Sequence, residues 1–187
     1  MKQGWQLPGC RKDAQSITRD WQPSDRPLID GVRVKESRNV IKGNGHLTEM
    51  YRRDWLGDDR PIDQVFQVAI HPGGLTAWHA HGATTDRLFA VSGSLLIVLY
   101  DGRQDSPTHR LVNVFRCGLA RPTLILVPPG VWHGVHNIGH EPAILVNMVD
   151  KAYRYEDPDH WRLPADSSEI PYRFANSKGA VDALGSG

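Results

Sequence analysis

The stretch GGLTAWHAHGATTDRLFAVSG, residues 73–93, decides how the rest of the chain is interpreted. It places His79 and His81 two residues apart and adds Asp86 five residues after the second histidine. Side chains on a strand alternate between its two faces, so both imidazoles project to the same side. Asp86 begins the next predicted strand and shares a face with Leu88, which is consistent with an inward direction. The stretch therefore predicts two histidines and a carboxylate that face one interior space.

A second stretch, PPGVWHGVHN at residues 128–137, adds a third histidine. His133 shares a strand face with Val131 and Val135, so it is also expected to point inward. One buried histidine is easily satisfied by a single hydrogen bond, whereas three converging imidazoles in an apolar interior indicate a functional pocket. The six remaining histidines are expected in turns or on solvent faces as ordinary polar residues: His46, His71, His109, His136, His140 and His160.

Short runs with alternating apolar residues recur along the chain between turn signals. Their spacing is typical of an all-β sandwich or barrel, and no amphipathic helix of ordinary length separates them. The runs 95–100 and 143–148 are apolar on both faces, so we expect each to be covered on both sides. Beyond residue 150 we expect a packed loop with a helical turn. The predicted strands are 32–40, 46–51, 65–70, 75–81, 87–92, 95–100, 111–116, 123–127, 131–137 and 143–149.

Length and composition indicate a single domain. The chain has 187 residues, of which 40% are hydrophobic, enough for one core of ordinary size. Pro8, Pro23 and Pro27 interrupt a non-periodic N-terminus. We therefore expect an N-terminal arm at 1–28, a barrel with a packed C-terminal loop at 29–174, and a loose tail at 175–187.

Charge and cysteine content narrow the surroundings of the protein. The formal charge is +1, without blocks of like charge, so neither nucleic acid nor an anionic membrane is an expected partner. Cys10 and Cys117 are too few for a disulfide framework, which favours a reducing compartment. The N-terminus lacks the apolar core of a signal peptide, and no window reaches the length of a membrane span. We expect a cytoplasmic protein.

The two histidine motifs together resemble those of the cupin superfamily, and most of the chain is similar to one branch, the dTDP-4-dehydrorhamnose 3,5-epimerase family. This resemblance implies a cupin double-stranded β-helix, or jelly-roll barrel, and we expect a homodimer through the N-terminal strands, with the arm before Asp30 crossing to the neighbour. The segments that carry the resemblance are GHLTEM at 45–50, AWHAH at 77–81, VSGSLLIVLYDGRQDSPT at 91–108, PPGVWHGVHN at 128–137 and DPDHWRLPADSSEIPY at 157–172.

The family resemblance also implies roles for individual residues. It matches His79 to the base that removes a proton beside the 4-keto group of a dTDP-linked 6-deoxy sugar, without a cofactor. It matches Asp166 to the carboxylate that orients this base, since such a base must be neutral and fixed in one tautomer. His81 completes the expected catalytic set. We expect His133, Asn147 and Arg87 to contact the substrate, a nucleotide sugar.

Several positions differ from the family pattern. Asn44 and Thr76 stand where the family has phosphate-binding arginines, and Asp86 stands near a lysine position. The tyrosine that returns the proton should fall at Val146 or Asn147, and Tyr153 and Tyr155 lie too far along the chain to be assumed substitutes.

These differences leave three alternatives open. The HAH sequence also resembles 3,4-ketoisomerases that work on sugar nucleotides with a histidine pair. A metal-dependent oxygenase or lyase acting on a small acid is the second alternative, because His79, His81, Asp86 and His133 form a complete ligand set for iron, manganese, nickel or zinc. In that reading Asp86 is the conditional member, since it could instead pair with Arg87. A sugar-binding cupin without turnover is the third.

Overall fold

A computed structural model describes residues 4–20 and 26–174 of the chain. These residues form twelve strands and no helix. The strands are β1 (Arg33–Glu36), β2 (Asn39–Lys42), β3 (Gly45–Thr48), β4 (Gln64–Ile70), β5 (Leu75–Ala80), β6 (Asp86–Ser92), β7 (Ser94–Asp101), β8 (Val112–Gly118), β9 (Thr123–Val127), β10 (Val131–Asn137), β11 (Ala143–Val149) and β12 (Trp161–Arg162).

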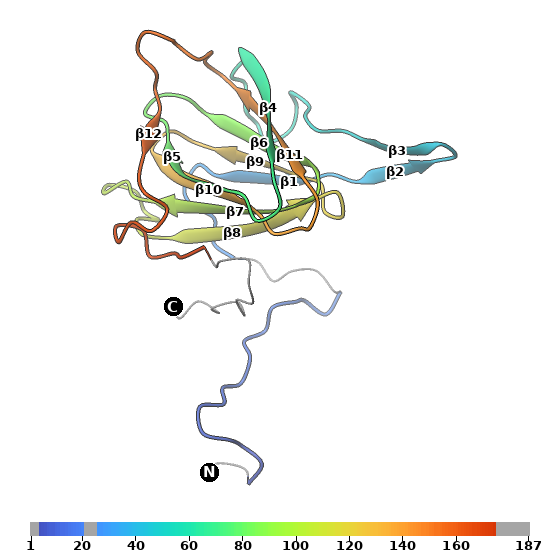
Figure 1. Ribbon diagram of the computed structural model, residues 1–187, viewed down its shortest axis with the longest axis vertical. Coiled ribbons are helices and arrows are strands. Elements are labelled where there is room, and N and C mark those ends of the chain that lie inside the picture. The colour runs from blue at the N-terminus through green and yellow to red at the C-terminus, as the bar shows by residue number, and fades with distance from the viewer. Residues whose placement is uncertain (1–3, 21–25, 175–187) are drawn as a thin grey trace.

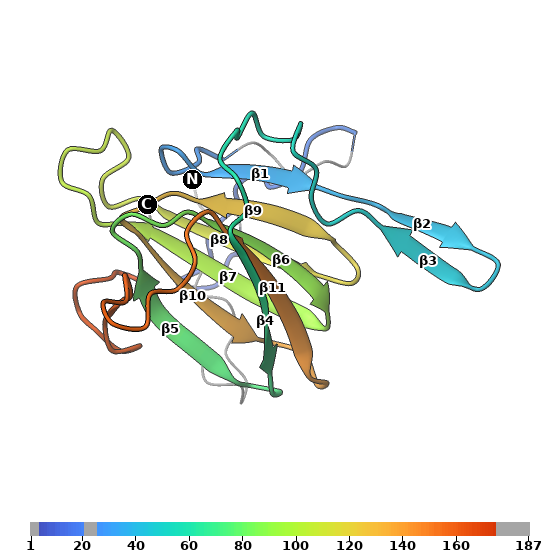
Figure 2. The same cartoon turned by 90° about the horizontal axis from the view of Figure 1, so that it is seen from above.

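Two five-stranded antiparallel sheets make up the barrel (Figure 2). One has the order β1-β9-β6-β11-β4 and the other has the order β12-β5-β10-β7-β8. Strands β2 and β3 form a separate hairpin that projects from the side of the barrel (Figure 1). The arrangement confirms the expected all-β cupin jelly roll.

The core lies between the two sheets and follows the alternation of side chains along each strand. Leu88 and Leu145 come from one sheet, and Ile97, Leu99 and Val135 come from the other. All five side chains are buried. Burial of apolar surface stabilises the folded state by about 25 cal/mol per Å². This shared apolar layer therefore holds the two sheets together around the interior pocket.

The two central strands with apolar residues on both faces are covered twice, as predicted. Leu96 and Val98 of β7 pack on their outer side against Ile170 from the C-terminal segment. Met148 of β11 packs on its outer side in a cluster with Trp55 from the loop between β3 and β4. Segments of the same chain therefore supply the second layer.

Differences from the predicted elements occur where the chain changes partner. The single strand expected at 32–40 is two strands, because β1 pairs with β9 whereas β2 pairs with β3. At the break, the Ser37 backbone N–H donates to the carbonyl of Pro122 and its hydroxyl donates to the carbonyl of Glu49. No helical turn forms among the described residues after 150; the two-residue strand β12 was not predicted.

The barrel begins near Ile29, which is buried and donates its backbone N–H to the Asn113 side chain. Residues 4–20 are exposed and run away from the barrel (Figure 1). The other parts of the predicted arm, 1–3 and 21–25, and the predicted tail, 175–187, lie outside the described residues. No helix that could span a membrane occurs in the described part of the chain.

Candidate active site

A cavity of about 820 Å³ lies between the two sheets. Strands β4, β5, β6, β10 and β11 and the segment 151–162 contribute its walls. His79, His81 and His133 all line it, in agreement with the inward direction predicted from alternation. Apolar side chains such as Leu88 and Leu145 line the same space, so the polar groups act in a partly desolvated setting.

The three predicted histidines form one cluster. His79 on β5 is directly opposite His133 on β10 in the strand register, and their rings lie 5.7 Å apart. The rings of His81 and His133 are 5.6 Å apart. His79 is 8% exposed and His133 is 6% exposed. Burial lowers the pKa of His133, so this imidazole is neutral near neutral pH.

Both ring nitrogens of His79 have partners among the described residues. Nδ1 lies 2.9 Å from Nε2 of His160, and Nε2 lies 2.6 Å from the hydroxyl of Thr76. Burial, together with the nearby His133 and Arg162, lowers the pKa of His79 to about 3. A neutral imidazole in a defined orientation is the form that can accept a proton from a carbon acid.

The structure does not bring Asp166 to His79. Asp166 is exposed in a turn and does not line the cavity, and the position expected for its carboxylate is taken by the ring of His160. From the sequence, His160 is expected in a turn or on a solvent face. The element that brings it inward is β12, where Trp161 pairs with Ala80 and Arg162 pairs with His79. A two-residue strand has no recognisable alternation, which is why this residue was missed.

Asp159 anchors the segment that carries His160. Its carboxylate accepts hydrogen bonds from the backbone N–H groups of Gly82, Ala83 and Thr84 at 2.6, 2.8 and 3.1 Å. Burial would raise the pKa of this carboxyl, but the hydrogen bonds from Gly82 and Ala83 lower it to about 2. The Asp159 carbonyl oxygen lies 2.5 Å from Nδ1 of His81, which orients that ring as well.

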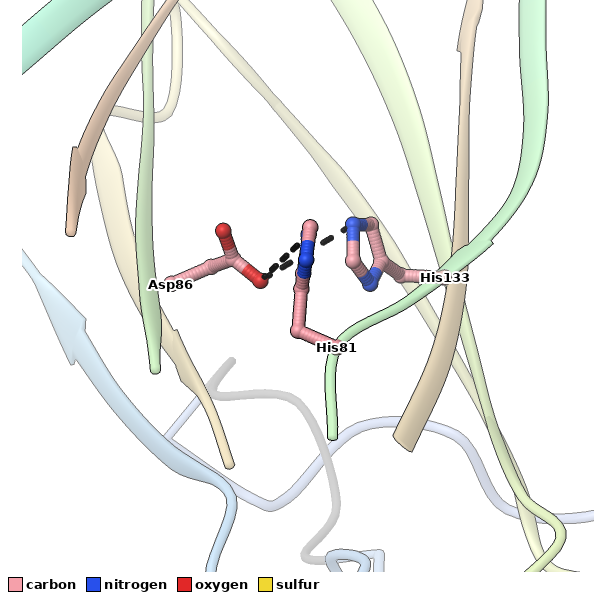
Figure 3. A group of neighbouring side chains, drawn as sticks. All are labelled: His81, Asp86 and His133. Carbon is pink, nitrogen blue, oxygen red and sulfur yellow. Dashed lines mark ion pairs between the residues drawn. The ribbon is translucent and has the colours of Figure 1, made fainter. Parts of the chain in front are cut away.

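Asp86 faces the cavity, as predicted, and is 2% exposed. Its Oδ1 accepts a hydrogen bond from the Asn147 side-chain amide at 2.7 Å, and the Asn147 oxygen accepts one from the backbone N–H of Arg87. Its Oδ2 lies 3.6 Å from Nε2 of His81 and 4.0 Å from Nε2 of His133 (Figure 3). Asn147 therefore lines the cavity and also holds the carboxylate in place.

Three of the four conditional metal ligands come together. One donor atom from each of His81, Asp86 and His133 lies within 4.8 Å of the others. Two imidazoles and one carboxylate that converge in this way suit a divalent metal such as iron or manganese. His79 is outside this group, because its nitrogens face Thr76 and His160.

Arg87 lies on the other side of β6 from the cavity. Its side chain is fully buried, and its guanidinium contacts a carboxylate oxygen of Asp58 at 2.6 Å. It also donates to the backbone carbonyls of Arg60 and Met148. Neighbouring residues on a strand point to opposite faces, so an inward Asp86 requires an outward Arg87. Arg87 therefore does not line the cavity, and it is not placed to make the expected contact with a substrate there.

The solvent side of the cavity is rich in cations and aromatic rings. Lys151, Arg154 and Arg162 line it and are exposed, and none of them forms an ion pair with another described residue. Tyr153 and Tyr155 line the same side, with their rings 5.3 Å apart in an edge-to-face arrangement. By position in the sequence both tyrosines lie too far along the chain to be assumed substitutes for the family's proton-returning tyrosine, but the segment after β11 turns back along the cavity.

Comparisons with known proteins agree with this architecture. No family model matches the chain. It is 36% identical over 143 residues to the probable low-salt glycan biosynthesis epimerase Agl13 of Haloferax volcanii. The aligned residues cover 75% of this chain and 90% of the relative.

Among the solved structures similar to this chain are a dTDP sugar isomerase and a dTDP-4-dehydrorhamnose 3,5-epimerase. A dTDP sugar isomerase from Desulfovibrio desulfuricans has a TM-score of 0.72 and 27% identity, covering 81% of this chain and 94% of that protein. A dTDP-4-dehydrorhamnose 3,5-epimerase from Bacillus anthracis has a TM-score of 0.68 and 21% identity, covering 76% of this chain and 83% of that one.

Proposed function

The chain belongs to the dTDP-4-dehydrorhamnose 3,5-epimerase family of cupins, and from this membership we propose that it epimerises a nucleotide-linked 4-keto-6-deoxy sugar. It is an enzyme of the isomerase class. The observation that carries the proposal is His79, a neutral imidazole that lines the cavity and is fixed through both ring nitrogens. Such a group is suited to remove a proton from a carbon next to a ketone.

The proposed reaction needs no net oxidation. Nε2 of His79 takes the proton from the carbon beside the 4-keto group, and the electron pair of the broken C–H bond forms an enolate. Return of the electron pair to that carbon, with a solvent proton added to its opposite face, restores the ketone. His79 then releases its proton to solvent. Substrate and product are isomers, and one solvent hydrogen enters the sugar for each epimerised centre.

The cations at the cavity mouth support a nucleotide sugar as the substrate. Asn44 and Thr76 provide no positive charge for a diphosphate, whereas Lys151, Arg154 and Arg162 line the exposed side of the cavity. Arginine and lysine side chains are the usual partners of phosphate oxygens. We propose that these three residues hold the diphosphate while the sugar enters the histidine-lined interior.

A deuterium-exchange experiment tests the proposal. Wild-type protein is incubated in D₂O with dTDP-4-keto-6-deoxyglucose, and proton NMR follows the hydrogens beside the ketone. We expect deuterium at one or both of these carbons, together with an epimeric product. A product with the ketone moved to the neighbouring carbon would identify the ketoisomerase alternative. If no 4-keto sugar nucleotide takes up deuterium from solvent, the proposal is wrong.

The group formed by His81, Asp86 and His133 supports a second candidate, a metal-dependent reaction. A divalent metal held there would act as a Lewis acid toward a substrate oxygen. For this candidate we expect about one metal per chain after growth in metal-replete medium, and loss of most of it in Asp86→Ala and His81→Ala, because each substitution removes one ligand.

Elemental analysis of purified protein decides between the two candidates. His79→Asn is the matched control and should retain the metal, since His79 lies outside the ligand group. If the wild-type protein holds well under one metal per chain after reconstitution and its activity is insensitive to chelators, the metal-dependent candidate is wrong. The metal-free acid-base reaction is then the remaining candidate.

We propose that the protein is a homodimer through its N-terminal strands. The projecting hairpin of β2 and β3 exposes Val40, Ile41 and Leu47, and Ile41 is 78% exposed. Apolar side chains gathered on a protruding element favour contact with a second copy. We expect Ile41→Asp to convert a dimer to a monomer in light scattering, while Ile138→Asp, at an exposed apolar residue in the loop between β10 and β11, leaves the dimer intact. A monomeric wild-type protein would contradict this proposal.

A further inference from the structure

The ring of His160 lies next to Nδ1 of His79, the ring nitrogen for which the proposed mechanism requires a hydrogen-bond partner. We propose that His160 is a positioning residue that holds His79 in the tautomer with its proton on Nδ1, leaving Nε2 free to act as the base. This inference rests on the proposed function, because the tautomer matters for proton removal from the sugar. It assigns to an imidazole the role that the family resemblance gave to the carboxylate of Asp166.

The contact between the two rings is direct. Nδ1 of His79 and Nε2 of His160 are 2.9 Å apart, a normal hydrogen-bond distance. The His160 ring lies 5.1 Å from the His79 ring and 5.1 Å from the His81 ring, so it sits against both members of the HAH motif. It also lines the cavity, which places it in the substrate compartment.

His160 is held from both sides along the chain. On one side, β12 pairs Trp161 with Ala80 and Arg162 with His79. On the other side, the Asp159 carboxylate accepts three backbone N–H groups from the turn at residues 82–84. Both attachments join the segment to β5 and the turn that follows it, which carry the HAH motif. The position of His160 relative to His79 is therefore built into the backbone.

The hydroxyl of Thr76 favours one direction for the proton on His79. Among the described residues its hydrogen-bond partner is Nε2 of His79, at 2.6 Å. If Nε2 carried the proton and donated it, the Thr76 O–H would have no described acceptor in a half-buried site. If Nδ1 carries the proton and donates to His160, Thr76 donates to Nε2, so both ring nitrogens of His79 and the Thr76 hydroxyl are satisfied. A hydroxyl rotates freely, so an entering substrate can replace it at Nε2.

Two variants separate hydrogen bonding from ring packing. His160→Phe keeps an aromatic ring of similar size but has no acceptor for the His79 proton. His160→Gln restores an acceptor oxygen on a flexible side chain. Ser168→Ala, at an exposed site later in the same segment, is the control for general effects of mutation. Thermal unfolding of each variant checks that it is folded.

The first readout is ¹⁵N NMR of the histidine rings, which distinguishes the two neutral tautomers without any substrate. We expect His79 in the wild type to be protonated at Nδ1, and His160→Phe to shift it toward a mixture. The second readout is deuterium exchange into the sugar nucleotide. We expect His160→Phe to lower kcat about 10- to 100-fold with little change in KM, since the base remains but is misoriented, and His160→Gln to recover much of the loss.

The outcomes distinguish this inference from the proposed function. A wild type whose His79 tautomer depends on His160, but which exchanges no deuterium, would contradict the function and support the positioning role. Exchange in the wild type together with an unchanged tautomer and kcat in His160→Phe would overturn the positioning role alone. A changed tautomer in Asp166→Asn, without one in His160→Phe, would overturn it in favour of the carboxylate.

Discussion

Replacement of His79 by asparagine is expected to lower deuterium exchange into the sugar by about two to four orders of magnitude, the usual contribution of a positioned general base. Asparagine can place its amide near the position of Nδ1 and so still bond His160, but it does not reach the position of Nε2 beside Thr76 and has no basic nitrogen. The measured quantity is kcat for exchange beside the ketone in D₂O, with KM determined in the same experiment.

Binding of the nucleotide part provides the internal control for His79→Asn. The cations proposed to hold the diphosphate, Lys151, Arg154 and Arg162, lie on the exposed side of the cavity and do not include His79. Calorimetric affinity for dTDP should therefore change little in the variant. Exchange that stays within a few-fold of the wild type would show that another group removes the proton, and the proposed mechanism would be wrong.

The barrel could be predicted because its strands are short, apolar and clearly bounded. The predicted limits of β9, β10 and β11 agree with the structure, since turn residues such as Pro128 and Gly130 separate β9 from β10 and charged residues flank β11. The inward direction of His79, His81 and His133 could be predicted from alternation alone. A shift of one residue would turn every side chain of a strand to the opposite face, so the positions of the buried apolar residues also fix the direction of the histidines. Local pattern was sufficient for these features.

The roles of individual polar residues depend on contacts that no local pattern contains. His160 meets His79 across 81 positions of the chain, through a two-residue strand and an anchor at Asp159. Arg87 is expected from the sequence to contact the substrate, although the same alternation that turns Asp86 inward turns Arg87 outward. Its partner, Asp58, lies in a charged loop whose position could not be read from sequence.

Arg87→Met is expected to destabilise the protein by about 3 kcal/mol or more, the usual effect of removing one partner from a buried ion pair. Arg87 is fully buried, and Asp58 is 4% exposed, so the substitution leaves a carboxylate with fewer partners in the interior. It also removes the donors to the carbonyls of Arg60 and Met148. Urea unfolding followed by tryptophan fluorescence measures the change in the free energy of unfolding.

A surface arginine and a double variant make this test specific. Arg121 pairs with Glu36 on the surface, where both side chains are about half exposed, and Arg121→Met should change stability by about 1 kcal/mol or less. Adding Asp58→Asn to Arg87→Met should recover part of the loss, because an uncharged amide is less costly to bury than an unpaired carboxylate. If Arg87→Met instead unfolds like the wild type while its affinity for the sugar nucleotide falls, then Arg87 serves the substrate and the buried pair does not support the fold.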